Sequence, residues 1–164
     1  EQKNPDLVVK AVAQLAEEDP EITCVLVGDG PEHEAVTELI ERFGLEDNVS
    51  CPGFLDEHDE VLGLMKAADV LAHPSRREGF GITALEALAC GTPVVTIRHP
   101  QNASTELVED GVTGAICAPN ADAIADGIRT TRVRMAEEDC IASAQTYDWD
   151  QITRRLETTY RELS

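Results

Sequence analysis

The stretch HPSRREGFGITALEALACGTPVV, residues 73–95, predicts a strand, a glycine-rich turn, a helix and a second strand. An apolar run ends near His73, a Pro-Ser pair turns the chain, and two glycines lead into helical periodicity over about residues 81–90. A second apolar run follows at residues 94–97. The order strand, helix, strand is typical of a parallel sheet, because parallel strands need a crossover connection.

Short apolar strands alternate with helical patterns in both directions from this stretch. Helices are predicted ahead of Asp19 and over residues 32–43, 57–68, 104–109, 121–134, 137–146 and 148–163. Strands are predicted over residues 22–28, 48–51, 70–73, 94–97 and 115–117. This alternation predicts an α/β fold, a Rossmann-like three-layer sandwich with a parallel sheet of about five or six strands. We expect one domain over residues 1–164, with residues 148–164 as a closing helix.

The composition predicts a soluble, acidic chain. Its 164 residues include 32 Asp and Glu against 13 Lys and Arg, a formal charge of −19, which argues against a nucleic-acid binder because such proteins need a basic face. No apolar run reaches the length of a membrane span, no leader opens the sequence, and the five cysteines lack metal-ligand spacing, so we expect a reducing, cytoplasmic compartment. Many acids and few lysines suit concentrated salt, and we hypothesise a halophilic protein; an ordinary acidic protein is the alternative.

Two glutamates bracket the start of the helix predicted at residues 81–90. The glycines before this helix expose free N–H groups at the positive end of the helix dipole, which favours an anion. Glu78 lies just before that point and Glu86 in about the first turn. Two carboxylates would repel a bare phosphate, whereas a nucleotide sugar would place its diphosphate on the N–H groups and its hydroxyls on the carboxylates.

A structural interpretation of the same residues stays open. Thr83 and Glu86 have the spacing of a capping box, in which Glu86 only satisfies backbone donors. Glu78 could likewise be a solvated loop carboxylate paired with Arg76 or Arg77.

Two other strand-to-helix turns face the same edge of the predicted sheet. Gly28-Asp29-Gly30-Pro31 is a tight turn or a point of close ligand approach, and His33 replaces the third glycine of a dinucleotide fingerprint. In the second turn, Phe54 fits either the core or the flank of a flat ring. A retaining glycosidase would use paired carboxylates without a phosphate site, and a hydrolase triad would need a Gly-x-Ser-x-Gly turn that the sequence lacks.

The motif EGFGITALEALACGTPVV resembles the signature of glycosyltransferase family 4, the group 1 glycosyl transferases. Two glutamates are separated by seven residues and followed by Ala and then Gly-x-Pro-Val-Val. Further segments fall in family order: Lys3-Asn4, Gly28-Asp29-Gly30-Pro31, Gly53-Phe54, residues 68–75, residues 106–111 with Gly114, and Trp149 with the last helix. The resemblance covers nearly the whole chain. It implies the C-terminal, donor-binding half of a two-domain GT-B enzyme that moves a sugar from a nucleoside diphosphate with retention of configuration.

The resemblance implies which residues would hold the nucleotide. Lys3 would bind the diphosphate from one side, and the backbone amides of Gly81, Ile82 and Thr83 would bind it from the other. Glu86 would bind the ribose diol. The substrate would be a UDP-, GDP- or similar sugar, with no metal and no further cofactor.

The resemblance also implies which residues would face the sugar and the base. Glu78, the catalytic candidate, would orient the donor sugar together with the Gly79-Phe80 backbone. The Gly53-Phe54 turn would border the base.

The sequence departs from the family pattern in two places. The family's arginine on the first strand of this domain would fall ahead of Glu1, and Asn102-Ala103 stands where many relatives have Gly-Gly. The acceptor-binding half is also absent. We therefore expect a fragment, or one subunit of a split enzyme, that is inactive without an N-terminal domain. The alternative is a non-catalytic module or subunit that binds nucleotide sugars.

Overall fold

The secondary structure alternates between strands and helices, as the sequence predicts. The computed structural model describes residues 2–162. Its helices are α1 (Pro5–Glu18), α2 (His33–Phe43), α3 (His58–Ala67), α4 (Ile82–Ala89), the 3-10 turn η1 (Ala103–Glu106), α5 (Ala121–Arg134), α6 (Glu137–Gln145) and α7 (Trp149–Glu162). Its strands are β1 (Cys24–Val27), β2 (Val49–Gly53), β3 (Leu71–His73), β4 (Arg77–Glu78), β5 (Val94–Ile97), β6 (Gln101–Asn102) and β7 (Gly114–Cys117).

Local sequence explains several of these boundaries. Pro5 opens α1, and Gly44 ends α2 at a φ of 65°, in the left-handed region that favours glycine. The Asn120 side chain caps α5 by accepting a hydrogen bond from the Ala123 N–H at 2.9 Å. The helix predicted over residues 104–109 is instead the short turn η1, after which Leu107 and Val108 are buried in the core.

Within residues 2–162 the paired strands all run parallel, and they are divided among three sheets. β1 pairs with β2, β5 lies between β3 and β7, and β4 pairs with β6. The α/β class is confirmed, but the sequence predicts one continuous sheet, whereas β1 and β3 belong to different sheets. Side chains connect these two strands: Ala72 of β3 packs against the same apolar cluster as Cys24 and Leu26 of β1.

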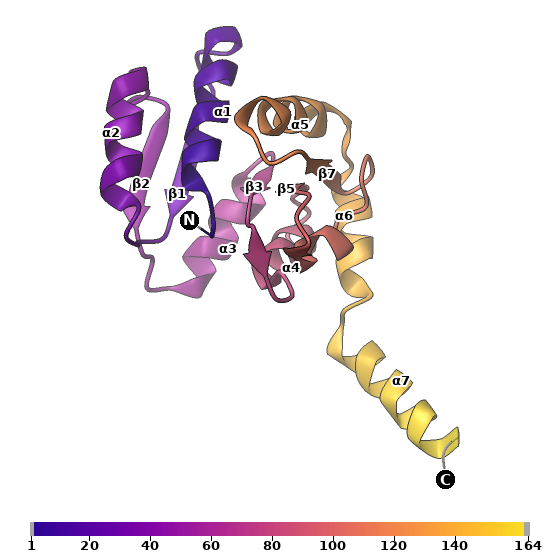
Figure 1. The fold of residues 1–164 in the computed structure, drawn as a ribbon. Helices are drawn as coiled ribbons and strands as arrows, with labels where there is room; N and C mark the ends of the chain where they lie inside the picture. Colours follow the sequence, from indigo (N-terminus) through magenta and orange to yellow (C-terminus); the bar gives the residue numbers. More distant parts are fainter. Residues whose placement is uncertain (1, 163–164) are drawn as a thin grey trace.

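Helices cover both faces of the strands (Figure 1). α1 packs against α2 and α5, whereas α4 packs against α3 and α6. Because α1 is apolar on two sides, it contributes Val8, Val9 and Val12 to the cluster beneath α2 and Ala11 and Leu15 to the cluster beneath α5. α1 thereby packs on the β1–β2 half of the molecule and on the β5–β7 half.

The last helix forms as predicted but projects from the body of the molecule (Figure 1). The apolar side chains Trp149, Ile152, Leu156 and Tyr160 recur at helical spacing, yet α7 buries none of its residues, and Trp149 is 79% exposed. Periodicity predicts an amphipathic helix, but it does not specify what the apolar face packs against. Within residues 2–162, no helix has both the length and the apolar character needed to cross a bilayer.

Candidate functional site

The amino end of α4 is the centre of the candidate site. Gly81 is its N-cap residue, with a φ of 95°, and it carries no side-chain cap. The N–H groups of Ile82, Thr83 and Ala84 precede the first intrahelical bond, which runs from Leu85 N to the Gly81 carbonyl at 3.0 Å. Ile82 and Thr83 are exposed, so this helix end presents backbone donors and the positive dipole end at the surface.

Close packing requires glycine at position 81. A Cβ atom there would lie 2.9 Å from Ser104 Cβ and 3.1 Å from Leu107 Cδ1. The turn η1 therefore lies directly against the helix end. Because Gly81 has a left-handed backbone and no side chain, η1 can approach the end of α4 this closely.

Asn102 fixes η1 in that place. It is buried, its Nδ2 donates to Thr96 Oγ1 at 3.0 Å and to the Ile97 carbonyl at 2.8 Å, and its Oδ1 accepts from Ser104 Oγ at 2.6 Å. Asn102 also pairs with Glu78 in the β4–β6 ladder. Asn102, which stands where many relatives have glycine, thus connects β4, the strand that carries Glu78, to β5 and to η1.

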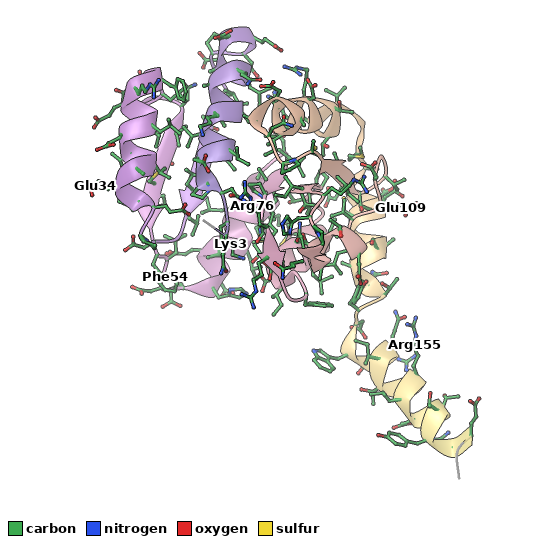
Figure 2. All side chains as sticks on the ribbon, viewed as in Figure 1. Lys3, Glu34, Phe54, Arg76, Glu109 and Arg155 are labelled. Atoms are coloured by element: carbon green, nitrogen blue, oxygen red, sulfur yellow. The ribbon has the colours of Figure 1, made fainter. Side chains whose placement is uncertain are left out.

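The first residues of the chain run beside the loop after β3. Asn4 is buried in a left-handed conformation, with a φ of 48°, and its Nδ2 donates to the Pro74 carbonyl at 2.7 Å. Arg76 N donates to the Gln2 carbonyl at 2.8 Å. Figure 2 shows Lys3 and Arg76 next to each other as a result. These contacts bring Lys3, near the first residue of the chain, to the candidate site around Glu78 and α4.

Lys3, Glu78 and His73 form one hydrogen-bonded group. Lys3 Nζ donates to Glu78 Oε2 at 2.6 Å, and His73 Nε2 lies 3.2 Å from the same oxygen. The hydrogen bond from Lys3 lowers the pKa of the Glu78 carboxyl, and His73 adds to this. Burial lowers the pKa of His73, so its imidazole is neutral near pH 7. Glu78 therefore pairs with Lys3 and His73, not with the arginines that the solvated-loop interpretation names.

Replacing Lys3 by methionine is expected to raise the pKa of Glu78 toward the ordinary value of about 4.3. A carboxyl with a lowered folded-state pKa stabilises the fold above its ordinary pKa, and this stabilisation disappears as the pH falls through the lowered value. The acid side of the stability profile should therefore shift to higher pH in Lys3→Met. Carboxyl-carbon NMR titration of Glu78 measures the change. Lys10→Met, which removes an exposed pair with Asp6, is the control; an unchanged Glu78 titration in Lys3→Met would contradict the assignment.

Glu86 lies on α4 with a histidine beside it. His58 Nε2, in the first turn of α3, is 3.3 Å from Glu86 Oε1. The capping-box interpretation of Thr83 and Glu86 is wrong, because the helix begins at Ile82 and its N-cap, Gly81, has no side-chain cap. The Glu86 carboxylate is half-buried and faces α3. It is therefore available to a ligand at the α3–α4 edge.

The remaining predicted residues lie just before α4 and in the turn that follows β2. Phe80 stacks edge-on against Tyr147, with ring centroids 5.7 Å apart, which holds the Gly79-Phe80 backbone near the start of α4. Gly53 accepts a hydrogen bond from Gly28 N at 2.8 Å, so the two glycine turns meet. Phe54 is 76% exposed and lies at the margin of the molecule (Figure 2), which rules out the core position.

Two histidines at the site have no local sequence signal. His73 and His58 each contact one of the two motif glutamates, yet their neighbours along the chain give no reason to select them. Across residues 2–162, no group of three or more His, Cys, Asp or Glu side chains has the geometry to hold a metal ion.

Comparisons with known proteins identify the family of this chain. The sequence model of the family described as Glycosyl transferases group 1 matches residues 1–132. A D-inositol 3-phosphate glycosyltransferase of Corynebacterium efficiens is 32% identical over 99% of this chain and 40% of the relative. An alpha-D-kanosaminyltransferase of Streptomyces kanamyceticus is 30% identical over 99% of this chain and 43% of the relative. The chain therefore spans about 40% of the length of these relatives.

Solved structures give the same result. HepE of Anabaena, determined with UDP and glucose, superposes with a TM-score of 0.79 at 31% identity, covering 98% of this chain and 45% of HepE. The pneumococcal O-GlcNAc transferase GtfA, determined with UDP and GlcNAc, gives a TM-score of 0.81 at 26% identity, covering 98% of this chain and 33% of GtfA. These neighbours have the GT-B fold, and the match lies in the C-terminal half of the relatives. On the sequence, the fold and these matches together, the chain belongs to the group 1 glycosyl transferase family.

Proposed function

We propose that this chain is the donor-binding part of a retaining glycosyltransferase that transfers a sugar from a nucleoside diphosphate to an acceptor. The observation that carries the proposal is the convergence of Lys3, Glu78 and the amino end of α4 on one edge of the fold. A cation and backbone donors would bind the diphosphate, while carboxylates would accept hydrogen bonds from hydroxyl groups. HepE and GtfA were each determined with UDP and a sugar, which supports a substrate of this class.

In this proposal each group has a distinct task. Lys3 and the N–H groups of Ile82 and Thr83 stabilise the charge that grows on the leaving diphosphate as the bond to the sugar breaks. Glu86 accepts hydrogen bonds from the ribose, and Glu78 orients the donor sugar. The Gly53-Phe54 turn borders the base, where the exposed ring of Phe54 can lie against a flat heterocycle.

Calorimetric titration with UDP, GDP and their glucose, N-acetylglucosamine and mannose esters tests the proposal. We expect the 164-residue chain to bind at least one of these compounds and to transfer no sugar. Binding without transfer by a longer protein that includes the N-terminal region would favour the non-catalytic module. Failure of every compound to bind at near-millimolar concentration would contradict the proposed function.

We further propose that the protein works in concentrated salt. A formal charge of −19 on 164 residues is self-repulsive in dilute buffer, and salt shortens the screening length from about 10 Å at 0.1 M to about 3 Å at 1 M. The melting temperature is expected to rise by several degrees between dilute buffer and 1 M KCl, with most of the rise at the lower concentrations. The control is the same series of melting temperatures across KCl concentrations at a pH near 4, where many carboxylates are protonated. A melting temperature that does not rise between dilute buffer and 1 M KCl would contradict salt adaptation.

A further inference from the structure

A single carboxylate oxygen, Glu78 Oε2, has two partners of different kinds. Lys3 Nζ lies 2.6 Å away and His73 Nε2 lies 3.2 Å away. A carboxylate only accepts hydrogen bonds, so the proton of the neutral His73 ring is on Nε2 and points at Glu78. Lys3 and Glu78 are the titratable groups that face this imidazole.

The two partners differ in how firmly the fold holds them. The Lys3 side chain is 59% exposed, at the end of a flexible four-carbon stem. His73 is 8% exposed and ends β3, where it is in register with Thr96 of β5. Thr96 Oγ1 also donates to the His73 carbonyl at 3.0 Å. The Lys3 side chain can therefore rotate about several bonds. The backbone of His73 is held by the sheet, and burial restricts its ring.

Donor binding would separate these partners. A diphosphate carries more negative charge than one carboxylate, so it would attract the Lys3 ammonium away from Glu78. The Glu78 carboxylate would then lose its shorter hydrogen bond while negative charge arrives beside it. His73 is the partner that remains, because its ring is buried and its backbone is paired within the sheet.

We propose that His73 is a positioning residue, which holds the Glu78 carboxylate toward the donor sugar through its Nε2–H once Lys3 has turned to the diphosphate. The inference rests on the proposed function, because it concerns the same donor site. It assigns to His73 a task that acts through Glu78 and leaves the nucleotide untouched. Loss of the Nε2–H should therefore weaken sugar recognition more than nucleotide binding.

Two substitutions of nearly equal size separate the hydrogen bond from packing. In His73→Gln the side-chain amide can present an N–H near the position of Nε2, whereas in His73→Asn the shorter amide falls short of Glu78. The readout is the ratio of the dissociation constants for UDP and UDP-glucose, measured by calorimetry on the 164-residue chain. We expect His73→Asn to lower this ratio about fivefold or more and His73→Gln to keep it within about twofold. The dissociation constant for UDP alone should stay within about twofold in both variants.

Two controls complete the experiment. Thr92→Val removes a buried hydrogen bond, from Thr92 Oγ1 to the Met65 carbonyl at 2.6 Å. Thr92 lies just before β5 begins, at the opposite end of that strand from the residue that pairs with His73. This variant should therefore leave the ratio unchanged. In a Glu78→Ala background, His73→Asn should have no further effect on the ratio, because the residue through which it acts is gone.

The outcomes distinguish this inference from the proposed function. If UDP, GDP and all of their sugar esters fail to bind the unaltered chain, the proposed function fails and the inference fails with it. If GDP and its esters bind in place of UDP, the same ratio is measured with GDP and the sugar ester that binds. If the nucleotide and its sugar ester both bind, but His73→Asn keeps the ratio or lowers it equally in the Glu78→Ala background, the inference alone is overturned. Nitrogen NMR of the unaltered chain gives a measurement that needs no variant: the His73 Nε2–H must persist in the complex with UDP-glucose, and its loss there would also overturn the inference.

Discussion

Replacing Glu86 by glutamine is expected to weaken binding of a nucleoside diphosphate sugar by about tenfold or more. Hydrogen bonds to a charged group contribute about 1.5–3 kcal/mol each, and about 1.4 kcal/mol corresponds to a factor of ten. Glutamine keeps the shape of the side chain but removes the charge. A ribose diol that donates two hydrogen bonds to the carboxylate would therefore lose much of their strength.

The same substitution should change the stability of the fold very little. Glu86 caps no backbone donor at the start of α4, and its Oε1 lies 3.3 Å from Nε2 of the exposed His58 imidazole. A contact between a half-buried carboxylate and an exposed imidazole contributes little to folding, so the melting temperature should stay within a few degrees. Calorimetry and thermal unfolding on one preparation measure both quantities.

Glu38→Gln is a matched control for Glu86→Gln, because Glu38 is exposed on α2. It removes the same charge from the chain and should leave donor affinity unchanged. A large fall in melting temperature with unchanged affinity in Glu86→Gln would assign the carboxylate a structural role. Such a result would remove the ribose contact from the proposed site.

Replacing Gly81 by alanine is expected to lower the melting temperature by about 5 °C or more and to abolish donor binding. The left-handed backbone at 81, with a φ of 95°, costs an L-residue about 1–2 kcal/mol. The new Cβ would also lie 3.1 Å from the backbone Cα of Ser104, which cannot rotate away as a flexible side-chain end would. Relief of this clash would move η1 or the amino end of α4, and so disturb the N–H groups that we propose bind the diphosphate.

Gly63→Ala tests whether the loss is specific to position 81. Gly63 lies inside α3, and a Cβ there meets nothing within 4 Å. Alanine should stabilise that helix slightly, because glycine is the poorer helix former by about 0.5–1 kcal/mol. Thermal unfolding of the two variants should therefore give changes of opposite sign. A Gly81→Ala chain that keeps both stability and affinity would contradict the close packing at η1.

Local patterns predict the elements of this fold better than their association. The glycines ahead of residues 82–89 and the apolar spacing within them specify α4 because helix ends and helix faces depend on near neighbours. The separation of β1 from β3 has no such signal: both strands are short apolar runs, and their pairing depends on the path of the whole chain. The same holds for α7, whose periodicity specifies an apolar face without specifying a partner.

The candidate site divides in the same way. Glu78, Gly81 and Glu86 lie within one continuous motif, so their proximity follows from a single turn and helix. The contact of Lys3 with Glu78 joins residues 75 positions apart, and from the sequence only the resemblance to a family assigns both residues to one donor site. His73 and His58 become candidates only when the fold places them beside the glutamates.

The hydrogen bond from Asn4 to the Pro74 carbonyl determines how the backbone of Lys3 is held. Residues 2–4 form a short tether between the loop after β3 and α1, and the ammonium group of Lys3 is carried on that tether. Because Gln2 and Asn4 are both hydrogen-bonded to that loop, the backbone of Lys3 is held on either side, and only its side chain can change the position of the ammonium group.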